Sequence, residues 1–261
     1  MQIYLDSFAA FLSVKNGQFR VRLSNGETRL FAVRTVNAIL LTKRTGMSTD
    51  AALLAVEQDI PVLLMDAQTH APLALISSGK PGNIATVRKN QPEFCRSSDA
   101  FQWVAQVLAQ KIRAQQALIE IWIEKPDTPA DHRADGQYAC FLLHPLADRI
   151  QHWPIHSGEN TLLPLKTRRS IAESWRGIEG TASRIYFQQI STQLSGIIEF
   201  EGRQQRPAYD PFNALLNYLY GMLYTSCHLA LLKNGLDPYL GILHADQYGD
   251  RPTLVYDFIE P

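Results

Sequence analysis

The side chains best suited to chemistry lie in residues 235–261, where the histidine His244 is followed by two carboxylates, Asp257 and Glu260. The two acids stand at positions i and i+3, so on a helix both project from one face. The interval between His244 and Asp257 leaves room for a turn and the start of a second element. An imidazole and two carboxylates that converge form a mixed nitrogen and oxygen site for a divalent cation. Such a site needs at least one further ligand from elsewhere in the chain.

Glu179 is the strongest candidate for that further ligand. It lies on the apolar face of a helix that the sequence predicts from about Thr167 to Ile190, four residues after Trp175 and three before Ala182. A carboxylate on a buried face is costly unless it is paired, protonated or bound to a metal.

Two interpretations of Glu179 remain open. Gly177 and Gly180 flank it, and each costs a helix about 1 kcal/mol relative to alanine. Glycines around an inward acid indicate that a ligand approaches the backbone closely there. The alternative is a structural ion pair with a neighbour such as Arg184.

The composition is that of a folded protein. The chain has 261 residues, of which 46% are hydrophobic, which excludes a disordered chain and suffices for one large domain or two modest ones. The formal net charge is zero, from 25 basic and 25 acidic side chains, so total charge does not indicate nucleic-acid binding. Cys95, Cys140 and Cys227 are far apart, and no apolar leader follows Met1, so we expect a reducing, cytoplasmic location.

The first 76 residues predict a small β-rich domain. Two Asn-Gly pairs, at 16–17 and 25–26, are hairpin turns, and Ser48 caps a short helix that runs to Gln58 with the apolar residues Ala52, Leu53 and Val56 at helical spacing. The expected strands are apolar or alternating segments: QIYLD, AFLSV, FRVRL, TRLFAV, NAILLT, IPVLLMD and PLALIS. The turn-forming residues 77–82 form a linker, and we place a helical domain at 83–261. The predicted class is α+β, with a β-sandwich-like first domain and an all-helical second domain.

Two further helices are expected in the second domain. One is capped by Asp99 and runs to about Glu124, where Pro126 and Pro129 end it, with a buried stripe of Phe101, Val104, Leu108, Ile112 and Leu118 or Ile119. The other follows Asp210-Pro211, ends at Gly235, and is so apolar that we expect it to be central. Its polar residues exclude a membrane span. Residues 125–166 give no clear pattern, and Pro154 separates His152 from His156, which argues against a zinc pair there.

Asn213, Asn217, Tyr220 and Tyr224 form a polar stripe along the apolar helix. The simpler interpretation is that the amides cap neighbouring backbone; the other is that the stripe orients Glu179, His244 or a phosphate. Basic residues cluster around the same segments and favour a phosphate backbone as ligand. They are Lys80, Arg88, Lys89, Lys166, Arg168, Arg169, Arg176, Arg184, Arg203 and Arg206.

Four blocks, in this order, carry a family resemblance: RGIEGTASRIYF, RQQRPAYDPFNALLNYLYGML, GLDPYLGILH and LVYDFIEP. Together they resemble the CRISPR-associated Cas1 integrase and endonuclease family over nearly the whole chain. The resemblance implies an N-terminal β domain that mediates homodimerisation and a helical domain that holds a divalent metal, Mg²⁺ or Mn²⁺. Family members usually continue past the last block with further helices, so the sequence is either a fragment or a short form.

Carried over by motif, the metal ligands and catalytic residues are Glu179, His244 and Glu260, with Asp257 as an auxiliary acid. Arg184, Tyr186, Arg203, Asn213 and Asn217 also fall within matched blocks and are candidate contacts to DNA or to the ligands.

The implied activity belongs to CRISPR adaptation, a step of antiviral defence. A free 3′-hydroxyl of captured DNA attacks a phosphodiester at a repeat of the CRISPR array, together with a Cas2 partner. Metal would assist the hydroxyl and stabilise charge at phosphorus. The alternatives are a non-catalytic DNA-binding scaffold of the same fold and a transposon-borne, casposase-like integrase. A metal hydrolase of small molecules is more distant, because it leaves the basic clusters unexplained.

Overall fold

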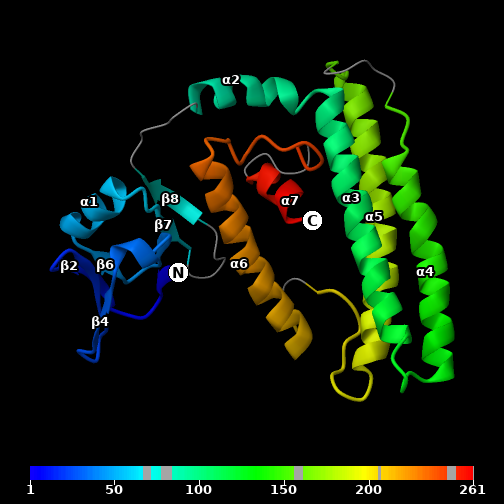
Figure 1. Cartoon of the computed structure of the whole chain (residues 1–261), viewed down its shortest axis with the longest axis horizontal. Coiled ribbons are helices and arrows are strands. Elements are labelled where there is room, and N and C mark those ends of the chain that lie inside the picture. The colour runs from blue at the N-terminus through cyan, green and yellow to red at the C-terminus, as the bar shows by residue number, and fades with distance from the viewer. Residues whose placement is uncertain (67–71, 78–83, 156–160, 205–206, 246–250, 261) are drawn as a thin grey trace. The chain divides into compact units, whose positions relative to one another are not determined.

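The computed structural model describes residues 1–66, 72–77, 84–155, 161–204, 207–245 and 251–260 (Figure 1). The chain divides into two compact units, Met1–Gly82 and Asn83–Pro261. The first unit is rich in strands and the second is helical, so the predicted α+β class is confirmed. The predicted linker lies outside the described residues except for Ser77, as do Lys80, His156 and Arg206.

The strand-rich unit contains two four-stranded sheets. All seven predicted strands are present. The structure also has a strand that the sequence did not predict, β6, whose two residues are too few to form a recognisable strand pattern. The strand order in the first sheet is β1 (Gln2–Leu5), β5 (Ala38–Leu41), β7 (Val62–Met65) and β8 (Pro72–Ile76). The strand order in the second sheet is β4 (Thr28–Phe31), β3 (Gln18–Arg22), β2 (Phe11–Lys15) and β6 (Gly46–Met47). One core cluster joins residues of both sheets, including Leu12, Phe19, Ile39 and Val62, which agrees with a sandwich-like packing.

Turn chemistry sets the register of the second sheet. Asn16 and Gly17 have φ of 52° and 70°, the left-handed conformation that a two-residue hairpin between β2 and β3 requires. Gly26 has φ of 86°, and the Leu23 amide bonds the Glu27 carbonyl at 2.9 Å where β3 turns into β4. Both predicted hairpins are confirmed.

Helix α1 (Thr49–Glu57) begins as predicted, because the Ser48 hydroxyl accepts a hydrogen bond from the Ala51 amide at 3.2 Å. The apolar residues at helical spacing are not the ones that the helix buries. Ala51 and Ala55 are buried, whereas Leu53 is 54% exposed and Ala52 and Val56 are half-buried. Two alanines four residues apart let the helix pack closely on β2, a fit that apolar spacing alone does not reveal.

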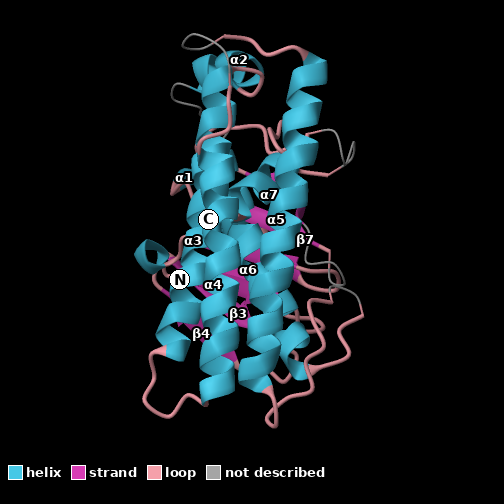
Figure 2. Cartoon of the chain, turned by 90° about the vertical axis from the view of Figure 1, so that its right-hand side faces the viewer, coloured by secondary structure: helices cyan, strands magenta, loops and turns pink. Residues whose placement is uncertain are grey.

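The helical unit is built on three long helices, α3, α4 and α5, that pack against one another side by side (Figures 1 and 2). Shorter or separate helices precede and follow them. The bounds are α2 (Ile84–Phe94), α3 (Ser98–Ile123), α4 (Ala130–Gln151), α5 (Leu165–Leu194), α6 (Pro211–Lys233) and α7 (Thr253–Ile259).

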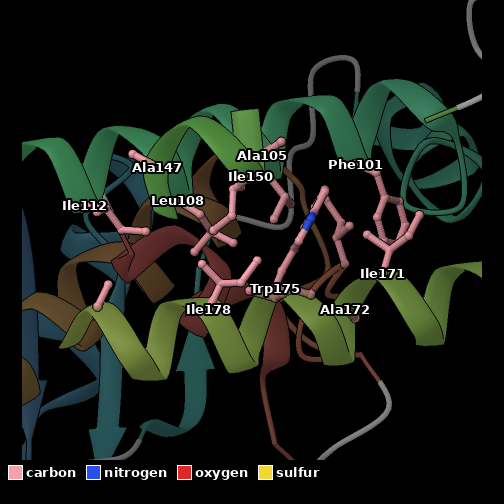
Figure 3. Close-up of a cluster of buried hydrophobic side chains, with 14 of the residues drawn as sticks. Phe101, Ala105, Leu108, Ile112, Ala147, Ile150, Ile171, Ala172, Trp175 and Ile178 are labelled. Carbon is pink, nitrogen blue, oxygen red and sulfur yellow. The ribbon is translucent and has the colours of Figure 1, made fainter. Parts of the chain in front are cut away.

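Trp175 of α5 is the centre of the helical core (Figure 3). It is fully buried, with its ring 5.9 Å from Phe101 and edge-on to Trp153 at 6.2 Å. Large aromatic side chains contribute most of the apolar area in such cores. The stripe predicted along this helix is confirmed by the buried residues Ile171, Trp175, Ile178, Ala182 and Ile190.

Helix α3 begins two residues earlier than predicted, and Asp99 is not its cap. The Ser97 hydroxyl accepts a hydrogen bond from the Ala100 amide at 3.2 Å, which places Asp99 in the first turn. The predicted apolar stripe is confirmed, with Ile119 rather than Leu118 as its buried member.

Helix α4 lies where the sequence gives no clear pattern. Gly136 and Pro145, which obscure the helical signal, both sit inside it. A Cβ at Gly136 would lie 2.3 Å from the Cγ2 of Ile123, so glycine allows α4 to approach α3. His152 caps the end of α4, and its proposed pairing with His156 cannot be followed within the described residues.

Helix α6 has the predicted ends. Asp210 accepts a hydrogen bond from the Asn213 amide at 2.8 Å, and Gly235 has φ of 75°. The helix is not central, however, because Leu215, Tyr218 and Met222 are more than half exposed. The apolar count predicted burial, and the prediction was wrong for this face. Among the described residues, no helix has the length and apolar character that crossing a membrane requires.

Candidate active site

Two helices, α5 and α7, and the loop between α6 and α7 carry the predicted acids and the histidine. Glu179 comes from the middle of α5, and Glu260 from the residue that ends α7. His244 lies in the loop after α6, and Asp257 lies on α7. Helix α3 adds Lys111, which the sequence did not single out. In Figure 1, α7 lies beside α3, and Trp103 packs on Phe258 with ring centroids 5.3 Å apart.

Lys111 bridges the two glutamates. Its Nζ donates to Glu179 Oε1 at 2.7 Å and also to Glu260 Oε2. The side chains of Lys111, Glu179 and Glu260 are 18%, 25% and 17% exposed, so the cluster is mostly buried. The Ser183 hydroxyl donates a second hydrogen bond to Glu179 Oε1 at 2.8 Å.

In this cluster, Lys111 and Glu179 each shift the pKa of the other in the direction that keeps it charged. Burial by itself lowers the pKa of Lys111, but the charges of Glu260 and Glu179 outweigh burial and raise it above its ordinary value. Burial would raise the pKa of Glu179, whereas the Lys111 charge, its hydrogen bond, Ser183 and His244 together lower it. Glu179 and Lys111 are therefore both charged near neutral pH. The influence of His244 on Glu179 also places the imidazole in the same electrostatic environment.

Asp257 is the structural centre of the histidine loop. It is 2% exposed. Its Oδ2 accepts hydrogen bonds from the Ile242 and Leu243 amides at 2.6 and 3.2 Å. Its Oδ1 accepts from the His244 amide at 3.3 Å and lies 2.7 Å from His244 Nδ1. Both oxygens are thus used in shaping the loop.

This arrangement fixes the orientation of His244. A carboxylate at Nδ1 favours the tautomer in which Nδ1 carries the proton and Nε2 keeps its lone pair. Among the described residues, Nε2 has no hydrogen-bond partner, and the ring lies edge-on to Tyr256 at 6.1 Å. A histidine held in this way is oriented for ligation through Nε2.

Neighbouring helices hold the loop in place. The Gln91 side chain of α2 makes two hydrogen bonds of 2.8 Å with the Asp237 backbone, one to its carbonyl and one from its amide. Arg176 Nη1 donates to the Leu243 carbonyl at 2.7 Å. A Cβ at Gly241 would lie 2.9 Å from the Thr253 carbonyl carbon, so only glycine fits where the loop meets α7.

The two interpretations of Glu179 are now distinguishable. It is ion-paired, but its partner is Lys111, and Arg184, the neighbour named in the sequence analysis, is an exposed residue. A Cβ at Gly177 or Gly180 would meet nothing within 4 Å, so protein packing does not require glycine there. Lys111 lies three residues after Leu108, on the buried stripe of α3. A lysine at that position was the feature of the sequence that could have identified Lys111 as a partner of a buried acid.

The donor set fits a divalent cation in type. Two carboxylates and a neutral imidazole nitrogen are ligands that Mg²⁺ or Mn²⁺ accepts. Within the described part of the chain, no three His, Cys, Asp or Glu side chains converge closely enough to hold an ion. The Lys111 ammonium lies between Glu179 and Glu260, the position that a shared cation would take.

The candidate DNA contacts differ in accessibility. Arg184 is exposed, while Tyr186 is half-buried and stacks on Trp122 at 6.3 Å. Arg203 lies over the Tyr220 ring at 5.4 Å.

Asn213 is fully buried. Its oxygen accepts from the Gln204 amide at 2.8 Å and from Arg203 Nη1 at 3.1 Å, and its nitrogen donates to the Gly202 carbonyl at 2.8 Å. Asn217 donates to the Gln204 carbonyl at 3.4 Å. The prediction that these amides cap neighbouring backbone is confirmed.

Comparisons with known proteins agree on one family. The sequence profile described as "CRISPR associated protein Cas1" matches residues 3–261. The chain therefore belongs to the Cas1 family, as the four sequence blocks predicted.

Individual relatives span the whole chain. A protein of Pyrobaculum aerophilum named "CRISPR-associated endonuclease Cas1 2" is 30% identical over 100% of the chain and 78% of its own length. The "CRISPR-associated endonuclease Cas1" of Mycobacterium tuberculosis is 26% identical over 100% of the chain and 69% of its own length. The chain is thus shorter than both relatives.

Solved structures share the fold. The Cas1 protein of Thermotoga maritima has a TM-score of 0.66 at 17% identity, covering 100% of this chain and 73% of its own. A chain of a structure titled "Cas6-RT-Cas1--Cas2 complex" has a TM-score of 0.71 at 24% identity, and the match covers 100% of this chain and 26% of that chain. At these identities the likeness defines the architecture alone.

Proposed function

We propose that this protein is a metal-dependent DNA endonuclease and integrase of CRISPR adaptation. It would join captured DNA to a CRISPR repeat through attack of a 3′-hydroxyl on a phosphodiester. The observation that carries the proposal is the pairing of Glu179 and Glu260 through Lys111, with His244 near enough to lower the pKa of Glu179 and its imidazole oriented by the buried Asp257. Membership of a family whose relatives are named endonucleases supports it.

Each residue has a distinct role in this proposal. Glu179 and Glu260 supply carboxylate oxygens to the cation, and His244 supplies Nε2. Asp257 keeps the proton on Nδ1 and shapes the loop, so its contribution is positional. When bound, Mg²⁺ or Mn²⁺ would activate the attacking hydroxyl and stabilise negative charge on the attacked phosphate. No covalent intermediate with the protein is required.

DNA binding and assembly belong to the same proposal. Exposed basic residues such as Arg184 lie on α5, the helix that carries Glu179, and provide contacts to phosphates. The Cas1-containing structures titled as complexes with Cas2 and with DNA support partners of those kinds here. We assign homodimerisation to the β-rich unit by the family's plan.

One observation favours a second candidate, a non-catalytic DNA-binding scaffold. Lys111 already gives both glutamates a positively charged partner, so the cluster is held together without a metal. A scaffold would bind the same DNA and partner and would not join strands.

Strand transfer distinguishes the two candidates. A short duplex with a 3′-hydroxyl is incubated with a supercoiled plasmid carrying a CRISPR repeat, with Mn²⁺, Mg²⁺ or EDTA, with and without Cas2. We expect metal-dependent joining by the wild-type protein and none by Glu179→Ala or His244→Ala. Glu173→Ala is the matched control, because Glu173 is an exposed acid on the same helix. DNA binding without joining in every metal would establish the scaffold.

A further inference from the structure

Lys111 makes its contacts with the two carboxylates proposed as metal ligands. Its Nζ bonds one oxygen of Glu179 and one of Glu260, which are 68 and 149 residues away in the chain. A lysine on the buried stripe of a helix is rare unless it is paired, because burial of an ammonium is costly. Here the pairing is to two acids at once.

An ammonium and a divalent cation compete for such a position. Carboxylate oxygens bind Mg²⁺ at about 2.0–2.1 Å, whereas the Lys111 nitrogen stands 2.7 Å from Glu179 Oε1. Two cations of like sign sharing the same oxygens in a mostly buried cluster would repel strongly. The oxygens therefore serve either the ammonium or the metal.

We propose that Lys111 is a positioning residue that takes the metal's place between Glu179 and Glu260, and that a divalent cation binds by displacing it. The inference rests on the proposed metal site. The ammonium relieves the repulsion between the two acids and ties α3 to α5 and α7 while no metal is bound. The consequence is a protein that stays ordered without metal and holds metal less tightly than its ligands alone would allow.

The local structure permits this exchange. Lys111 is attached through four flexible methylene groups and is 18% exposed, so its ammonium has a short path to solvent. Glu179 keeps the hydrogen bond from Ser183 after the ammonium leaves. His244 remains oriented by Asp257, which makes no contact with Lys111 among the described residues.

Metal affinity of Lys111→Met tests the proposal directly. Methionine keeps the unbranched apolar stem and removes the ammonium. We titrate Mn²⁺ into EDTA-treated and then desalted protein by calorimetry, without DNA, so that the readout is independent of activity. We expect binding at least about five-fold tighter than in the wild type, the lower end of usual coupling between two sites. Lys125→Met, at an exposed lysine just beyond α3, is the matched control and should not change affinity.

Thermal unfolding separates competition from a purely structural role. In EDTA, Lys111→Met should melt below the wild type, because two carboxylates lose their shared counter-ion. At saturating Mn²⁺ the gap should close, because metal binding stabilises the variant more. A structural lysine would lower the melting temperature equally in both conditions and leave Mn²⁺ affinity unchanged or weaker, and that result overturns the proposal.

The two proposals fail differently. If the wild type binds Mn²⁺ and Lys111→Met binds it no more tightly, the metal function stands and the displacement inference falls. If neither protein binds Mn²⁺, the proposed metal function falls and the inference with it. Should Lys111→Met not fold, Lys111→Gln gives the same test with a polar side chain, and tighter Mn²⁺ binding remains the expected result.

Discussion

Asp257→Asn is the most informative single substitution in this site, because it changes charge and hydrogen bonding while keeping shape. The wild-type carboxylate accepts from three backbone amides and faces His244 Nδ1. An asparagine retains one acceptor oxygen and gains an NH₂ group. In the better orientation the oxygen keeps the Ile242 and Leu243 amides, and the NH₂ group faces His244.

Two consequences follow from that orientation. The His244 amide loses its acceptor, and a buried unsatisfied donor costs about 1–3 kcal/mol of folding free energy. His244 Nδ1 now has to accept a hydrogen bond, so the ring proton moves to Nε2 and the lone pair proposed for the metal is lost. Removing a partner that orients a ligand typically weakens metal binding by about 10–100-fold.

Urea unfolding and Mn²⁺ calorimetry measure these two effects. We expect a fall of about 2 kcal/mol in the free energy of unfolding and Mn²⁺ binding at least about ten-fold weaker. Asp237→Asn is the matched control in the same loop, because within the described part of the chain the Asp237 side chain accepts only the Tyr239 amide, which an asparagine oxygen also accepts. Unchanged Mn²⁺ affinity together with normal strand transfer in Asp257→Asn would refute the assigned role of Asp257.

Three further predictions concern packing, pH and DNA. Gly136→Ala should lower the free energy of unfolding by about 1–3 kcal/mol in urea melts, because its Cβ would overlap Ile123, whereas Gly221→Ala meets nothing within 4 Å and should not destabilise. Burial lowers the pKa of His228 below its ordinary value of 6.5, so the unfolded chain takes up the proton first as the pH falls. Stability should therefore decline below about pH 6.5, and His228→Leu should lessen the decline; an equal decline in both proteins would contradict this. DNA affinity should fall steeply with salt as phosphate contacts release counterions, and a salt-independent dissociation constant in a fluorescence anisotropy titration would count against phosphate binding.

The sequence predicted the local features of the fold well. Strand alternation, the Asn-Gly turns and the caps Ser48 and Asp210 act over a few residues, so a single segment contains the whole signal. Helix α4 was not recognised because Gly136 and Pro145 weaken its intrinsic preference, and packing against α3 compensates. The exposed face of α6 was misjudged because apolar composition does not specify which neighbour covers it.

The sequence was enough to predict which acids and which histidine belong to the candidate site. It was not enough to predict which side chains and backbone groups they contact. Glu179 stood out as an acid on an apolar face, yet its partner lies on another helix, and no spacing rule links α5 to α3. Likewise, the sequence identified Asp257 as an acid beside the proposed ligands. Its four contacts to the histidine loop depend on how α7 returns to that loop, which is a tertiary feature.

The wide separation of the site residues along the chain has a consequence for synthesis. Lys111 and Glu179 are made long before His244 and Glu260, and domains generally fold as their residues emerge from the ribosome. During that interval the first glutamate already has its lysine partner on a neighbouring helix. The nascent chain thus carries a neutral pair there, and the proposed set of metal ligands is complete only when the last of the four segments has been translated.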